Sequence, residues 1–258
     1  MKDLVLVERH CYKSSHPFYK ELDHLSFLSK NLYNSALYTI RQHYFKNKEY
    51  LNYYAINREF IDNSQIDYIS LPRKVSNQIL KLVDKNMVSF FKLLKLKNNG
   101  KYNKKVKLPK YLDKIKGRQI VHYERGAISF KRIGFVKLSQ TNISIPTKLN
   151  KDDIRFVRVV HKGSYIVIEI GYKVDCKEYF DNKRYASIDL GLHNLIAMSS
   201  PNIPNMLISG KPLISINQYF NKELAKKRSG LKRVNNTYNS KKINRLFNLT
   251  FRQKSQLL

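Results

Sequence analysis

The chain has 258 residues, and its 49 Lys and Arg against 19 Asp and Glu give a formal net charge of +30 at pH 7. So large an excess destabilises a compact state by self-repulsion unless a polyanion neutralises it. Nucleic acid is therefore the expected partner, and a dedicated small-molecule enzyme is disfavoured. Hydrophobic residues make up 42% of the chain, with 18 Tyr and 13 Phe, which argues against disorder along its whole length.

The two cysteines, Cys11 and Cys176, lie far apart and form no CxxC pair. This spacing favours free thiols in a reducing cytoplasm, with no disulfide framework and no zinc site. The N-terminal apolar stretch is too short for a secretory signal. An uncharged run over residues 190–210 is long enough to span a membrane, but its prolines, Asn and Ser indicate a strand and a loop instead. We therefore expect a cytoplasmic protein with no membrane partner.

In chain order, residues 3–12 predict a single strand that pairs with a distant one. Apolar residues then recur every three or four positions from Leu25 to Ile40, which predicts a helix. A shorter helical segment around residues 53–61 follows, and Leu71-Pro72 begins a second long helix that ends at Asn98. The tyrosines of this region are interpreted mostly as packing residues rather than as stacking platforms for nucleotides: Tyr33, Tyr38, Tyr44, Tyr50, Tyr53 and Tyr54.

From residue 119 the apolar period becomes two, which is typical of strands. Short strands are predicted over residues 119–123, 127–130, 135–138 and 142–145, and a hairpin over 155–161 and 165–172. Six short strands at this spacing suggest a barrel-like β domain that the N-terminal strand can join. The helices would then be an insertion between the first strand and the rest of the barrel.

The third region begins with an apolar strand over residues 185–190 that carries Asp189 near its end, directly before Gly191. A second strand is expected at residues 195–198, and two basic helices at 215–233 and 238–257. From residue 211 onward there are twelve Lys or Arg and one acid, Glu223.

An apolar strand that ends in Asp and Gly can place a carboxylate on a rigid element, beside a glycine that leaves room for a metal or phosphate. Hard carboxylate oxygens suit Mg²⁺, and two such ions can hold both oxygens of a phosphodiester displacement. The pattern also occurs as a plain turn, so by itself it is weak. The seven histidines show no ligand spacing.

The segment Ser187-Ile188-Asp189-Leu190-Gly191-Leu192-His193-Asn194-Leu195 closely resembles the first RuvC motif of the transposon-encoded TnpB proteins. These are also called OrfB-type transposases and are relatives of the compact type V CRISPR effectors. Three other segments resemble the same family in order and spacing: Gly210–Lys222, Leu71–Leu93 and Tyr19–Asn34.

The resemblance implies a multidomain α+β fold. A β-barrel wedge domain, residues 1–18 and 113–181, would be split by a helical recognition domain, residues 19–112, and a partial RuvC domain of the ribonuclease H-like α/β class would follow at 182–258. The family pairs a guide RNA from the transposon end with target DNA and cuts at one metal-dependent RuvC site, so guide RNA and target DNA are the implied partners. Asp189 takes the place of the first catalytic carboxylate and metal ligand.

The sequence departs from the family after this residue. A RuvC site needs further carboxylates, yet Glu223 is the only acid after Asp189, and it lies where the family has no catalytic residue. One carboxylate does not hold two Mg²⁺ ions in a field of Lys and Arg. The family's four-cysteine zinc ribbon is missing as well. We therefore expect a chain truncated within its RuvC domain that does not cut DNA. Mg²⁺ would belong to the complete family site, and no zinc is expected.

The candidate nucleic-acid-binding residues form two groups. The first surrounds Tyr102 and Tyr111 in a loop: Lys101, Lys104, Lys105, Lys107 and Lys110. The second lies on the basic helical pair: Lys226, Lys227, Arg228, Lys232, Arg233, Lys241, Lys242 and Arg245. Phosphate contact is the functional interpretation of both. A solvated flexible loop is the alternative for the first group, whereas the second has too few acids nearby for i,i+4 ion pairs.

Three hypotheses remain open at this point. The first is a TnpB-like, RNA-guided DNA-targeting protein of a mobile element that is catalytically incomplete. The second is a nuclease-dead DNA- or RNA-binding protein, such as a repressor or an RNA chaperone. The third, a ribosome-associated basic protein, fits the charge but leaves the strand of Asp189 unexplained.

Overall fold

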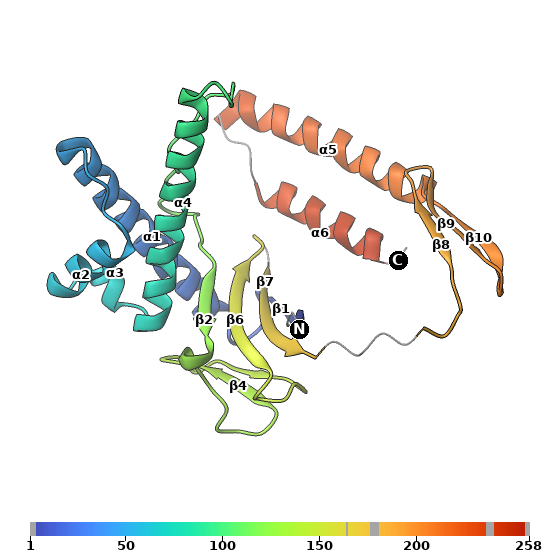
Figure 1. Cartoon of the computed structure of the whole chain (residues 1–258), viewed down its shortest axis with the longest axis horizontal. Coiled ribbons are helices and arrows are strands. Elements are labelled where there is room, and N and C mark those ends of the chain that lie inside the picture. The colour runs from blue at the N-terminus through green and yellow to red at the C-terminus, as the bar shows by residue number, and fades with distance from the viewer. Residues whose placement is uncertain (1–3, 164, 176–180, 236–239, 256–258) are drawn as a thin grey trace. The chain divides into compact units, whose positions relative to one another are not determined.

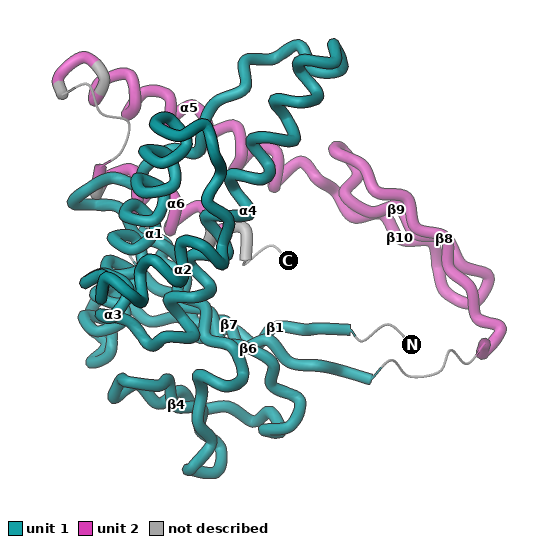
Figure 2. Tube along the Cα trace, turned by 60° about the vertical axis from the view of Figure 1, so that its left-hand side comes forward, with its two compact units in different colours: residues 1–176 teal, residues 177–258 magenta. Residues whose placement is uncertain are grey.

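The computed structural model describes residues 4–163, 165–175, 181–235 and 240–255. The chain divides into two compact units, residues 1–176 and 177–258, which Figure 2 distinguishes by colour. Within the described ranges, unit 1 contains a strand, four α-helices and six further strands, and unit 2 contains three strands followed by two helices (Figure 1). The fold is therefore mixed α+β, as predicted. Cys11 is an exposed free thiol, and Cys176 lies outside the described residues.

The main sheet of unit 1 is antiparallel, with the strand order β1-β7-β6-β2. Its strands are β1 (Leu4–Lys13), β2 (Val121–Glu124), β6 (Ile154–His161) and β7 (Tyr165–Val174). β1 pairs with β7 along its whole length, from Leu4 opposite Val174 to Lys13 opposite Tyr165. This confirms the predicted N-terminal strand with a distant partner and the predicted β6–β7 hairpin.

A second, smaller sheet of unit 1 has the order β3-β4-β5. Its strands are β3 (Ile128–Ser129), β4 (Phe135–Leu138) and β5 (Ser144–Pro146). The barrel-like closure suggested by the sequence is not what the hydrogen bonds of the described strands show, because they form two separate sheets. The outer strands β3 and β5 are two and three residues long. Pro146, moreover, has no N–H to extend a ladder.

The helices of unit 1 lie between β1 and β2 in the sequence: α1 (Tyr19–Asn47), α2 (Tyr53–Asp62), α3 (Ile66–Ile69) and α4 (Arg73–Asn98). Pro72 is the N-cap of α4, as the Leu-Pro pair predicted. The helix α3 was not predicted, because four residues are too few for an apolar period to show. The side chain of Gln65 caps α3 by accepting a hydrogen bond from the backbone N–H of Tyr68 at 2.8 Å.

The helices and the main sheet of unit 1 share one hydrophobic core. The apolar face of α1 packs against α4, and side chains from β2, β6 and β7 complete the interior. Fully buried members include Leu32, Ile40, Val83, Met87, Val121, Val157 and Ile168. Every third or fourth residue of the helices and every second residue of the strands contributes, which is the periodicity that the sequence displays.

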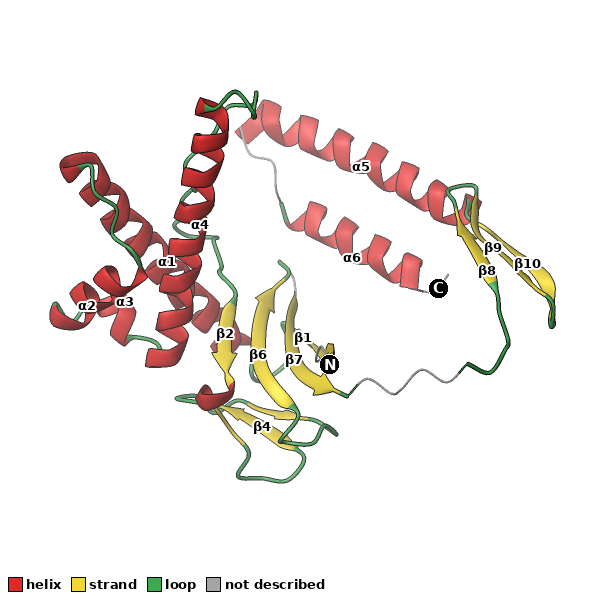
Figure 3. Ribbon diagram, in the orientation of Figure 1, coloured by secondary structure: helices red, strands yellow, loops and turns green. Residues whose placement is uncertain are grey.

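Unit 2 consists of an antiparallel meander followed by two helices (Figure 3). Its elements are β8 (Ser187–Leu190), β9 (Asn194–Ser200), β10 (Ile203–Ser209), α5 (Lys211–Asn235) and α6 (Lys241–Ser255). The rings of Phe220 on α5 and Phe247 on α6 meet edge to face, with their centroids 4.9 Å apart. Among the described helices of the chain, none is long and apolar enough to cross a membrane.

The segment after β9 was predicted as a loop and is instead the strand β10. Pro204 misled the sequence prediction, because proline is rare inside a sheet. Here the proline is accommodated at the edge of the meander, where the register shifts between Ile203 and Met206.

Candidate nucleic-acid interface

Asp189 lies within β8 and not in the turn that follows it. It is paired across the sheet with Ala197 of β9, which in turn is paired with Leu207 of β10. Because alternate residues of a strand share a face, this row lies on the same side as Ser187 and Ser199. These residues, together with Asn205, Met198 and Met206, line a shallow cleft of about 380 Å³. The carboxylate thus has hydroxyl and amide neighbours on one face of the meander.

The opposite face of the meander is apolar. It carries Ile188, Leu190, Ile196, Met198, Met206 and Ile208. A continuous apolar strand is expected to be buried on its apolar face, but here Ile188 is 58% exposed and Leu190 is 74% exposed. The physical reason is that α5 and α6 pair with each other through Phe220 and Phe247, which leaves the face of this sheet without a covering layer in unit 2.

Two glycines shape the turn after Asp189. A Cβ added at Gly191 would come within 2.8 Å of the Asn194 carbonyl oxygen, and one at Gly210 within 2.1 Å of the Leu192 carbonyl oxygen. The Gly210 N–H donates to the His193 carbonyl at 2.7 Å, and the Gly210 carbonyl accepts the first bond of α5 from Ile214. Gly191 is therefore required by the hairpin itself, which is the turn interpretation of the motif, and the hairpin is fastened to the start of α5.

The donor set around Asp189 does not fit a pair of magnesium ions. In the described part of the chain, no group of three or more His, Cys, Asp or Glu side chains gathers at one point. Glu223, the one other acid after Asp189, is engaged elsewhere, in an ion pair with Lys227 of the next turn at 3.4 Å. A single carboxylate supplies too few hard oxygen ligands to fix two divalent cations.

The predicted cations of the helical pair are distributed over both helices. Lys226, Arg228 and Arg233 of α5 are exposed, as are Lys242 and Arg245 of α6. Lys227 is partly buried beside Glu223, so one i,i+4 ion pair does form in this region. The side chains of Lys232 and Lys241 lie outside the described residues.

Two cations that the sequence prediction omitted complete a row on α5. Successive helical residues are rotated by about 100°, so positions 11, 15 and 22 residues apart return to nearly the same face. Four exposed side chains therefore lie within about 60° of one another along roughly 33 Å of helix; we call them the α5 cation stripe: Lys211, Lys222, Lys226 and Arg233. A helical projection of the basic segment would have found Lys211 and Lys222.

The first predicted group of lysines lies in unit 1, in the irregular segment after α4. The helix ends in a Schellman motif: Gly100 has φ +70°, the Lys101 N–H donates to the Leu96 carbonyl at 2.9 Å, and the Gly100 N–H donates to the Lys97 carbonyl at 3.0 Å. The lysines that follow are all exposed: Lys101, Lys104, Lys105, Lys107 and Lys110. Leu108 and Leu112, in contrast, pack against the core of unit 1 and anchor the segment.

The tyrosines interpreted as packing residues divide into two kinds. Tyr33 is buried, and the Tyr50 hydroxyl donates to the Asp84 carboxylate at 2.7 Å, so these two fit the prediction. Tyr38 and Tyr54 do not, because they are 57% and 78% exposed.

The arrangement described so far defines a class: a two-unit α+β protein whose second unit joins a carboxylate-bearing antiparallel meander to a strongly basic helical pair. Residues 169–256 match the family model OrfB_IS605, which is described as "Probable transposase". This match covers about a third of the chain, and over that segment it agrees with the resemblance to the OrfB-type, or TnpB, transposon proteins drawn from the sequence. No protein of curated function matches the chain.

Two solved structures are similar to the chain at a low level. One is titled a cryo-EM structure of the Cas12f1-sgRNA-target DNA complex; it has a TM-score of 0.34 and 16% identity, over 98% of this chain and 67% of that one. The other is titled a cryo-EM structure of a CRISPR-Cas12f ternary complex; it has a TM-score of 0.39 and 13% identity, over 92% of this chain and 56% of that one. The chain thus spans about two thirds and somewhat over half of their respective lengths. Values this low carry no conclusion about activity or partners.

Proposed function

We propose that this chain is a nucleic-acid-binding protein of a mobile element, of the TnpB type, that binds a structured guide RNA and through it engages target DNA. The α5 cation stripe is the observation that carries the proposal. Its four cations are exposed, and within the described part of unit 2 no acidic side chain forms an ion pair with any of them. A bound polyanion would neutralise the positive charge that the acidic side chains of the chain leave uncompensated.

The geometry of the stripe suits a phosphate backbone better than a small anion. Four charges spread over about 33 Å cannot converge on one phosphate, but they can follow successive phosphates of a helical strand. Contacts of this kind position a nucleic acid without reading its sequence, so base pairing by the guide RNA would supply specificity. The exposed lysines after α4 would form a second contact of the same type on unit 1.

The domain roles follow the same proposal. The helices of unit 1 would act as the recognition domain, its two sheets as the wedge domain, and unit 2 as part of a RuvC-like domain. We further propose that these 258 residues bind nucleic acid without cutting it, because within the described residues no group of three or more His, Cys, Asp or Glu side chains gathers to hold metal ions with Asp189. A repressor-like or RNA-chaperone role is the alternative if guided targeting of DNA is absent.

The binding proposal is tested by the salt dependence of RNA affinity. A double variant, Lys222→Ala with Lys226→Ala, should weaken binding of a labelled RNA hairpin and reduce the slope of log K against log salt. The slope should fall by about 0.7–0.9 for each phosphate that the variant no longer neutralises, measured by fluorescence anisotropy. The matched control removes two exposed lysines at the end of α1, Lys46→Ala with Lys48→Ala. Equal slopes for the two variants would refute the role of the stripe.

The cleavage proposal needs a separate measurement. The full chain, its guide RNA and a matching DNA duplex are incubated with Mg²⁺, and the DNA is analysed on a denaturing gel. We expect retention of the DNA without strand scission. Scission that disappears in Asp189→Ala would show that the residues present do form an active metal site.

A further inference from the structure

The segment that follows the basic loop is fastened to α1 by side-chain bonds to its backbone. The Asn34 amide donates to the Leu112 carbonyl and accepts from the Leu112 N–H, both at 2.9 Å. The Lys30 ammonium, whose residue is only 2% exposed, donates to the Lys114 carbonyl at 2.7 Å. These bonds fix residues 111–114 against the helix although the segment has no regular secondary structure.

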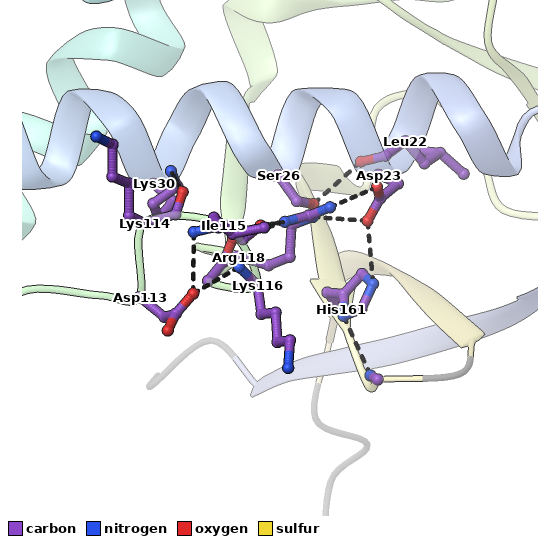
Figure 4. Close-up of polar contacts among 12 residues, drawn as sticks. Leu22, Asp23, Ser26, Lys30, Asp113, Lys114, Ile115, Lys116, Arg118 and His161 are labelled. Atoms are coloured by element: carbon purple, nitrogen blue, oxygen red, sulfur yellow. Dashed lines mark hydrogen bonds and ion pairs between the residues drawn. The ribbon is translucent and has the colours of Figure 1, made fainter. Parts of the chain in front are cut away.

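The fastening continues toward Arg118 (Figure 4). Asp113 accepts hydrogen bonds from the N–H groups of Ile115 and Lys116, which folds a tight turn. Arg118 then forms a two-pronged ion pair with Asp23 at 2.7 and 2.8 Å. The walls that α1 and this segment present are therefore pre-ordered rather than loose.

Between these walls lies a cleft of about 400 Å³. Two exposed aromatic rings belong to its lining, Tyr38 of α1 and Tyr111 of the segment, which are 57% and 42% exposed. Asn31, Asp67 and Lys114 also line it. An open cleft that combines aromatic faces, an amide, a carboxylate and a lysine is suited to a flat, polar ring compound attached to a phosphate.

The guanidinium of Arg41 packs on the ring of Tyr111. The guanidinium carbon of Arg41 is 4.8 Å from the centroid of this ring. The Nε atom of Arg41 is buried, and it has no hydrogen-bond partner within the described residues. The guanidinium holds the Tyr111 ring in place, but its Nε–H gives up its hydrogen bond to water in doing so. This cost is offset where a ligand binds the opposite face of the ring.

We propose that this cleft binds one unpaired nucleobase, stacked on Tyr111 and Tyr38, with the adjoining phosphate at Lys114. The inference rests on the proposed nucleic-acid-binding function and deepens it, because it assigns a contact for single-stranded nucleotides to unit 1. A base inside a duplex is stacked on both sides and is not available to such a cleft. The carboxylate of Asp67 can accept a hydrogen bond from a donor on the edge of the base, either an exocyclic amine or a ring N–H.

The experiment uses the full chain and RNA twelve-mers that carry 2-aminopurine at one position, whose fluorescence falls on stacking. Single strands should bind with quenching, and the same strands in a duplex should bind without it. Tyr111→Ala should lower single-strand affinity about five-fold or more and remove most of the quenching, whereas Tyr111→Phe should keep both. Tyr54→Ala is the matched control, since Tyr54 is an exposed tyrosine of α2 and does not line the cleft.

The possible outcomes separate the two proposals. If the chain binds neither RNA nor DNA, the proposed function fails, and the cleft proposal fails with it. If single strands bind but Tyr111→Ala behaves like Tyr54→Ala, only the cleft proposal is overturned. Asn34→Ala offers a check that leaves both rings intact: it should release residues 111–114, visible as faster hydrogen exchange, and lower single-strand affinity without altering duplex affinity.

Discussion

The Asp23 carboxylate of α1 joins two segments that are distant in the sequence. One of its oxygens contacts the Arg118 guanidinium at 2.7 Å and the His161 Nε2 at 3.1 Å. The hydrogen bond from Arg118 holds the pKa of Asp23 below its ordinary value. The Nδ1 of His161 accepts from the Gly163 N–H at 3.1 Å, so in the neutral ring the proton lies on Nε2 and faces Asp23.

This geometry predicts a pH dependence of stability. Burial lowers the pKa of His161 below its ordinary 6.5, with the charge of Arg118 acting in the same direction and Asp23 opposing it. Below pH 6.5 the unfolded chain therefore binds a proton that the folded chain does not, and the free energy of unfolding falls as the pH drops toward the folded pKa. His161→Gln should flatten the urea-unfolding profile below about pH 6.5.

A second half-buried histidine, His122, provides the comparison. Burial also lowers the pKa of His122, which stacks on Phe156 with the ring centroids 5.2 Å apart. His122→Gln should therefore remove a separate part of the same slope, and the double variant should remove both parts. If the free energy of unfolding of His161→Gln fell with pH as steeply as that of the unaltered chain, His161 would not be a source of the pH dependence.

At the scale of elements, the end of α4 depends on the backbone conformation of Gly100. A Cβ there would meet no atom within 4 Å, so Gly100→Ala tests the positive φ alone. The change should destabilise unit 1 by about 1–2 kcal/mol, as judged by chemical denaturation.

Gly230 lies inside α5 with equally open surroundings, and Gly230→Ala should stabilise that helix by ~0.8–1.0 kcal/mol. If both variants changed the free energy of unfolding in the same direction, the contrast between the two glycines would be wrong.

The elements also show which features a sequence can reveal. The existence of α1, α2 and α4 follows from an apolar period of three to four, although the period shows only the middle of α1, and the β6–β7 hairpin follows from two alternating runs joined at a glycine. By contrast, α3 depends on one side-chain cap from Gln65, and β10 depends on pairing with β9 despite Pro204. Local pattern does not encode either of these.

The candidate site was predictable in the same uneven way. Asp189 and the basic helices were visible in the sequence because a motif and a charge run are contiguous. The cleft at Tyr38 and Tyr111 was not, because it exists only through the bonds of Asn34 and Lys30 to a segment about eighty residues away. The exposure of Tyr38 likewise follows from which face of α1 the core covers.

At the scale of the whole molecule, the two units differ in how well their apolar side chains are buried. Unit 1 has an extensive core, whereas in the described part of unit 2 the apolar face of β8–β10 is largely exposed and Ile243 is the one buried hydrophobic side chain. Local stability follows burial, so unit 2 should open more readily than unit 1.

Hydrogen exchange detected by mass spectrometry measures this difference. Amides of β8–β10 should exchange much faster than those of α1 and α4, and addition of RNA should slow exchange along α5 by mass action on its folded form. Protection of β8–β10 equal to that of α1 would show that the apolar face is covered in solution. RNA-independent exchange of α5 would argue against the cation stripe.

The meander of unit 2 has a further consequence for handling the protein. β8 and β10 each pair with β9 alone, so among the described strands each leaves one row of N–H and C=O groups without a ladder partner. Unpaired edge strands next to an exposed apolar face can pair with the same strands of another molecule. Repulsion from the net charge of +30 opposes this association at low salt, but high salt screens the repulsion. Concentrated samples should accordingly be most prone to precipitate in high-salt buffers without nucleic acid, the very conditions used to strip RNA during purification.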